Sequence, residues 1–130
     1  MRILVLCIWS SIMFAFLFTF DLHGLISRGD FYIQMTLSPT FRFFEIYELP
    51  PELLLQKIGH TVMFAIWLLS VFLVVKNLKK AVFIISGCAI LSEMIQPFFM
   101  RDGHLLDMLF DGAGIFLMAV FINIFSQVGK

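Results

Sequence analysis

Four long apolar stretches, separated by short polar segments, dominate the pattern of hydrophobic positions along the chain. They cover residues 3–20, 58–75, 81–100 and 105–125. Each is about as long as a helix needs to cross a hydrocarbon core of roughly 30 Å. We therefore predict an all-α fold in which residues 1–130 form one domain, a four-span transmembrane helix bundle.

The segment between the first and second stretches is too apolar to be a free loop. Residues 41–49 mix aromatic and charged side chains, a combination that suits the headgroup region of a bilayer. We expect an interfacial segment, within residues 21–56, that packs on the end of the bundle. Pro51 and Glu52 are favourable at a helix N-terminus, so the second helix is expected to begin near Pro51, before it enters the membrane.

The composition supports a membrane protein. Hydrophobic residues occupy 61% of the 130 positions, only 14% are charged, and the mean hydropathy is +0.99. A soluble domain of this size would have too little polar surface to cover so much apolar side chain. The formal net charge is zero, so nothing in the charge favours nucleic acid as a partner. The expected partner is the lipid bilayer, and the sequence does not identify a protein partner.

The distribution of basic residues predicts the orientation of the chain. Lys76, Lys79 and Lys80 crowd the short turn between the second and third spans, and loops rich in lysine and arginine remain on the cytoplasmic side. With this turn inside, four spans place both termini in the cytoplasm. Residues 21–57 and the turn 101–104 then lie outside the cell membrane.

Polar side chains interrupt the apolar stretches at one level of the bilayer. Glu93 lies about 20 Å along the third span from its cytoplasmic end, and the fourth span begins close to Asp107. Because successive spans run in opposite directions, these positions and the start of the second span all fall in the outer third of the membrane. The set that converges there, called the polar cluster below, is Lys57, His60, Glu93, Gln96, Arg101, Asp107 and Asp111.

A buried charge without a partner is costly, so the members of the polar cluster are expected to face one another across the bundle. The cations Lys57 and Arg101, together with His60, are expected to offset the three carboxylates. Small residues beside the cluster would let the helix backbones approach closely; these are Gly87, Gly112 and Gly114. We interpret His23 and His104 as surface residues at the interface.

The order of these residues resembles the VanZ-like family. That family carries Lys-x-x-His, Glu-x-x-Gln, Arg and Asp-x-x-x-Asn-x-x-Gly in sequence. The matching positions, within residues 56–119, are "KIGH" (57–60), "SEMIQ" (92–96), Arg101, Asp107, Asp111 and Gly114. The chain departs from the family at two positions. At Gln56 an acidic residue or an asparagine is common in the family, and at Asp111 an asparagine is usual. The resemblance implies a bacterial envelope membrane protein, in a family whose founding member is linked to teicoplanin resistance, but it supplies no biochemical activity.

Three hypotheses for function remain open. The first is that the polar cluster binds an amphiphilic or envelope-lipid ligand and that the protein affects glycopeptide susceptibility. The expected partners are then the lipid bilayer and an envelope-lipid or glycopeptide-related ligand. The second is an intramembrane hydrolase or transferase that uses the carboxylates and a histidine as acid and base, although no nucleophile spacing identifies catalytic residues. The third is a purely structural partner of another membrane protein, in which the polar cluster only holds helices together. We predict no cofactor and no metal, because no second histidine stands at a ligand spacing.

Overall fold

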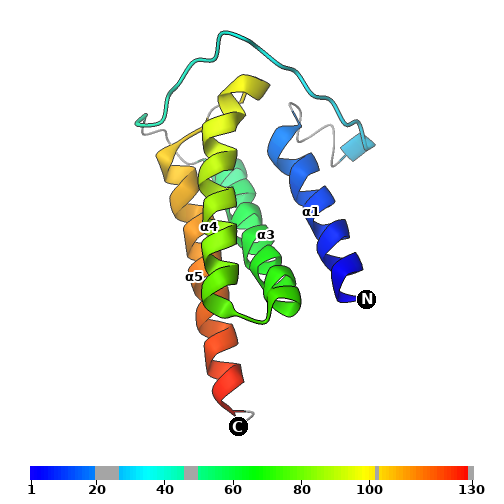
Figure 1. The fold of residues 1–130 in the computed structure, drawn as a ribbon. Coiled ribbons are helices and arrows are strands. Elements are labelled where there is room, and N and C mark those ends of the chain that lie inside the picture. The colour runs from blue at the N-terminus through cyan, green and yellow to red at the C-terminus, as the bar shows by residue number, and fades with distance from the viewer. Residues whose placement is uncertain (20–26, 46–49, 102, 129–130) are drawn as a thin grey trace.

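The computed structural model describes residues 1–19, 27–45, 50–101 and 103–128, and these residues form an all-helical fold (Figure 1). They contain four helices of 17 residues or more and one short 3-10 helix, with no strand in the described ranges. The elements are α1 (Arg2–Phe18), α3 (Pro51–Val75), α4 (Leu78–Ile95), η1 (Gln96–Phe99) and α5 (Leu105–Val128).

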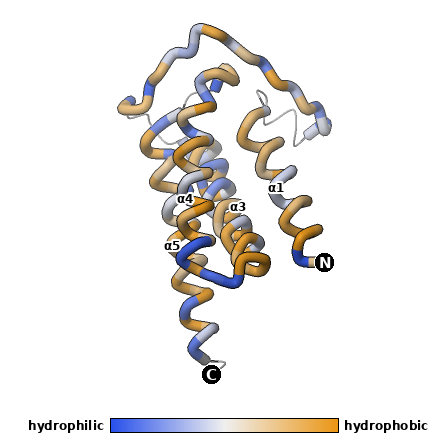
Figure 2. The backbone as a smooth tube through the Cα atoms, viewed as in Figure 1, coloured by the Kyte–Doolittle hydropathy of each residue, from blue (hydrophilic) through white to orange (hydrophobic). Residues whose placement is uncertain are grey.

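Helix length and composition confirm a membrane protein. The ranges Leu53–Val75, Leu78–Phe99 and Leu105–Gln127 are each long and apolar enough to span a bilayer. Helix α1 is apolar but shorter, with 17 residues, which is at the lower end of the roughly 17–25 residues that spanning helices use. Figure 2 shows hydrophobic residues along all four helices and hydrophilic residues at the turn between α3 and α4.

The turn between α3 and α4 is short because each helix end has a local solution. Lys76 ends α3 in the left-handed conformation, with φ of 58°, and its backbone N–H donates to the carbonyl of Phe72. Asn77 then begins α4, where its Oδ1 accepts a hydrogen bond of 3.0 Å from the backbone N–H of Lys80. An asparagine at this position satisfies a donor that the first helical turn leaves unpaired.

The third apolar stretch is not one continuous α-helix. Helix α4 ends at Ile95 and the chain continues as η1, because Pro97 has no N–H to donate to the carbonyl of Glu93 and would crowd it in an α-helix. Gly103 lies against that carbonyl instead, and a Cβ at Gly103 would overlap the oxygen. The proline therefore ends the α-helix, and the glycine lets the following turn fold back over it.

Helix α3 lies at the centre of the bundle, in contact with α1, α4 and α5 (Figure 1). The buried core between them includes Phe64, Leu68 and Ile85. Two indole N–H groups, one from each helix, join α1 to α3 by hydrogen bonds. The Nε1 of Trp9 donates to the carbonyl of Met63 over 3.2 Å, and the Nε1 of Trp67 donates to the Oγ of Ser10 over 3.0 Å.

Residues 27–45 run across one end of the bundle, where α4 ends and α5 begins (Figure 1). We call this the capped end. Two backbone hydrogen bonds of 2.9 Å fix the segment, from Thr36 N–H to the Phe98 carbonyl and from Leu105 N–H to the Phe43 carbonyl. This part of the expected interfacial segment packs on the bundle, but residues 29–45 form neither helix nor strand. Residues 21–26, with His23, and residues 46–49 lie outside the described residues, and from Pro51 onward the segment is already part of α3.

Candidate functional site

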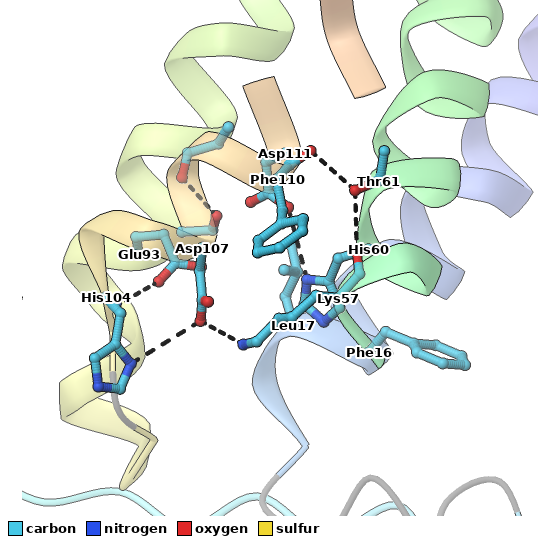
Figure 3. A network of polar contacts seen from close by, with 12 residues as sticks. Phe16, Leu17, Lys57, His60, Thr61, Glu93, His104, Asp107, Phe110 and Asp111 are labelled. Atoms are coloured by element: carbon cyan, nitrogen blue, oxygen red, sulfur yellow. Dashed lines mark hydrogen bonds and ion pairs between the residues drawn. The ribbon is translucent and has the colours of Figure 1, made fainter. Parts of the chain in front are cut away.

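Five members of the polar cluster come together at the capped end, contributed by α3, α4 and α5, namely Lys57, His60, Glu93, Asp107 and Asp111 (Figure 3). Lys57 and His60 come from the first turns of α3, and Asp107 from the first turn of α5. Six of the seven side chains are buried, and those of Glu93 and Asp111 are 0% exposed. The buried members are Lys57, His60, Glu93, Gln96, Asp107 and Asp111.

Lys57 and Asp107 form a buried ion pair that joins α3 to α5. The ammonium Nζ of Lys57 lies 2.6 Å from Oδ2 of Asp107. The same carboxylate oxygen lies 4.0 Å from the imidazole Nδ1 of His104. One of the three carboxylates of the polar cluster is therefore compensated by a cation in direct contact, as a buried charge requires.

Asp111 has a less complete environment. Its Oδ1 lies 3.7 Å from Nδ1 of His60, which is too long for a hydrogen bond. Neither carboxylate oxygen of Asp111 has a hydrogen-bond partner, and Nε2 of His60 also has none. These three atoms are fully enclosed by protein, so their hydrogen-bonding capacity is unused.

Only one of the two side-chain oxygens of Glu93 has a hydrogen-bond partner. Its Oε2 accepts a hydrogen bond of 3.1 Å from the backbone N–H of His104, whereas its Oε1 is buried with no partner. The prediction that His104 is a surface residue is wrong, because its side chain is only 13% exposed and its backbone contacts Glu93. The close approach of Gly103 to the Glu93 carbonyl brings His104 to this position.

Arg101 contacts α1. Its Nη1 lies 2.7 Å from the carbonyl oxygen of Phe16, 3.2 Å from that of Leu17 and 3.3 Å from that of Thr19. The guanidinium, which was expected to help offset the carboxylates, places its Nη1 on the carbonyl end of a helix, where a cation is favourable. Burial lowers the pKa of Arg101, and the carboxylates of Glu93 and Asp107 raise it.

Thr61, which the sequence analysis did not single out, lies at a close contact between α3 and α5. Its Oγ1 is 3.1 Å from the Lys57 carbonyl and 3.0 Å from the Phe110 carbonyl, so the hydroxyl joins the two helices. A Cβ at Gly114 would overlap the Thr61 carbonyl oxygen. The predicted close approach is therefore confirmed at Gly114. It is wrong at the other two glycines, Gly87 and Gly112, where a Cβ would meet nothing within 4 Å.

Gln96 is buried at the end of α4, and its backbone carbonyl accepts a 3.2 Å hydrogen bond from the N–H of Arg101.

Metal binding finds no support in the geometry. In the part of the chain that the structure describes, no three His, Cys, Asp or Glu side chains are placed to hold a metal ion. The chemistry that the cluster offers is that of hydrogen-bond acceptors on Glu93 and Asp111, with the imidazole of His60 beside them.

Comparison of the chain with protein-family models, with curated proteins and with solved structures finds no match.

Proposed function

We propose that this chain is a VanZ-like membrane protein of the bacterial cell envelope that binds an amphiphilic ligand at the polar cluster and thereby affects susceptibility to glycopeptides such as teicoplanin. The proposal joins the residue order shared with that family to the geometry of the capped end. In the proposed orientation, the capped end faces the outer leaflet and both termini are cytoplasmic. The ligand would be an envelope lipid or a lipid-linked precursor.

One observation carries this proposal. Four polar atoms of Glu93, Asp111 and His60 are buried without a hydrogen-bond partner. Leaving such groups unpaired in a low-dielectric interior costs about 1–3 kcal/mol each, and more for charged groups. A polar cluster that served only to hold helices together would gain little, since interhelical polar contacts contribute about 0.6 kcal/mol on average. A ligand that pairs with these atoms would offset this cost.

The test removes the carboxylate charge of Glu93 while keeping the shape of its side chain. Glu93→Gln retains the size of the side chain and can still accept from the His104 N–H, so we expect it to insert and fold. We expect bacteria that express this variant to lose the change in teicoplanin inhibitory concentration that the unmodified chain produces. His60→Gln tests the same site from α3, and we expect the same loss. Protein level and melting temperature in detergent are measured beside the phenotype.

Leu109→Ala is the matched control. Leu109 lies on α5 between the two aspartates in sequence, but it is 66% exposed at the surface of the bundle. It should retain both protein level and phenotype. Normal levels of both polar variants with an unchanged inhibitory concentration would count against a binding site. Loss of the folded protein in both would leave a structural role for the cluster as the better account.

A further inference from the structure

The unused hydrogen-bonding capacity of the polar cluster has a consistent chemical character. Three of the four unpartnered atoms are carboxylate oxygens, namely Oε1 of Glu93 and both side-chain oxygens of Asp111. The fourth is Nε2 of His60, which can donate or accept according to its protonation. A ligand that completes these contacts must bring hydrogen-bond donors.

The lysine and the arginine of the cluster are already in contact with acceptors. Lys57 lies on the Asp107 carboxylate at 2.6 Å, and the Nη1 of Arg101 lies on backbone carbonyls of α1, the closest at 2.7 Å. A phosphate or another anion entering between Glu93 and Asp111 would therefore meet carboxylates. Like charges close together in a low dielectric repel strongly, so the geometry disfavours an anionic group at this position.

We infer that the polar cluster recognises the primary ammonium group of an amphiphile through the carboxylates of Glu93 and Asp111. This inference rests on the proposed function and specifies the ligand. A primary ammonium carries a positive charge and three N–H donors, which equals the number of unpartnered carboxylate oxygens. Hydrogen bonds between two charged groups are also stronger than neutral ones. A quaternary ammonium has the charge but no donor, and a hydroxyl group has a donor but no charge.

The route to these atoms is set by the side chains that border them toward the capped end. Lys57 and His104 still expose 10% and 13% of their side chains, whereas Glu93 and Asp111 expose none. We therefore place the approach of the ammonium on the side of the cluster where these two partly exposed side chains lie. The acyl chains of the amphiphile remain outside the bundle, against exposed apolar side chains of α3 and α5 such as that of Leu55.

A series of phospholipids with identical acyl chains tests the inference on the purified full chain. Phosphatidylethanolamine, its N,N-dimethyl form and phosphatidylcholine keep the phosphate and the positive charge while the N–H donors fall from three to one to none. Binding in detergent is measured by native mass spectrometry. We expect the dissociation constant to rise at least about tenfold from the first lipid to the last, since tenfold corresponds to about 1.4 kcal/mol, close to one charge-assisted hydrogen bond.

Two variants and one soluble probe complete the experiment. Glu93→Gln and Asp111→Asn should each remove the preference for phosphatidylethanolamine, while Leu109→Ala should keep it. Glycerophosphoethanolamine added in excess separates a free amine from a lipid as the source of the recognised group. Competition by this soluble compound indicates that the head group suffices, and absence of competition indicates that the lipid is required.

Equal affinity of the unmodified chain for phosphatidylethanolamine and phosphatidylcholine would overturn the inference, and so would tighter binding of phosphatidylglycerol. If binding of phosphatidylglycerol were lost in Glu93→Gln, the polar cluster would still be a binding site and only the ammonium would be wrong. The proposed function fails separately, through an unchanged teicoplanin inhibitory concentration in the folded Glu93→Gln variant.

Discussion

Replacement of Gly114 by alanine tests the contact that sets the spacing between α3 and α5. The new Cβ would overlap the backbone carbonyl of Thr61, which cannot rotate away as a flexible side chain could. Gly112, two residues earlier on the same helix, is exposed and a Cβ there would meet nothing within 4 Å. The substitution is chemically identical at both positions, so the difference between them reports the packing of Gly114 alone.

The expected magnitudes follow from three contributions. Alanine is favoured over glycine inside a helix by about 1 kcal/mol, so Gly112→Ala should raise the free energy of unfolding by up to about that amount. At Gly114 the same gain is opposed by overpacking, which costs about 1–3 kcal/mol. Separation of the helices also lengthens the 3.0 Å contact of Thr61 with the Phe110 carbonyl, worth about 0.6 kcal/mol. Gly114→Ala should therefore lower the free energy of unfolding by about 0.5–2.5 kcal/mol.

Equilibrium unfolding in mixed detergent micelles, followed by circular dichroism, measures both variants against the unmodified chain. The two glycine variants should shift the midpoint in opposite directions. Because Thr61 lies beside Lys57 and His60 in the same turn of α3, Gly114→Ala should also weaken binding at the polar cluster. Equal stabilisation by both substitutions would refute the close contact between α3 and α5 at Thr61.

Two further predictions concern the buried ion pair and the orientation of the chain. Lys57→Met should lower the free energy of unfolding by about 3–5 kcal/mol, because it leaves Asp107 buried without its cation. Lys57→Met combined with Asp107→Leu should restore most of this loss. Equal losses in the single and double variants, measured in the same unfolding assay, would contradict a compensating pair. In a chain with Cys7 and Cys88 replaced by alanine, a cysteine at Ser38 should react with a membrane-impermeant thiol reagent on whole cells and one at Asn77 should be protected; the reverse labelling would invert the proposed orientation.

The helices, and the end of the bundle at which the polar residues meet, could be predicted from the sequence because both depend on position along the chain. Uninterrupted apolar stretches mark the helices, and the alternating direction of successive helices places Glu93, Asp107 and the start of α3 at the same end. The structure shows these residues adjacent at the capped end. The end of α4 before η1 could also have been predicted from Pro97, because proline disrupts an α-helix in a known way.

The partners of individual side chains could not be predicted, because hydropathy does not determine how each helix is rotated about its own axis. That rotation makes Gly114 face Thr61 while Gly112 faces outward. The contact of Arg101 with the carbonyl end of α1 was likewise not predicted. The position of His104 depends on a turn that folds back on Gly103, a tertiary contact with no counterpart in the local pattern.

The contact between Arg101 and α1 has a consequence for the order in which the protein is assembled. The last carbonyl groups of a helix have no donor within the helix, and at α1 the donor comes from a residue 82 to 85 positions later in the chain. During synthesis, α1 is made long before this donor exists. Its carbonyl end must rely on water or lipid headgroups until the turn before α5 has emerged and folded over it. The carbonyl end of α1 is therefore completed only after α3, α4 and the turn before α5 have been made.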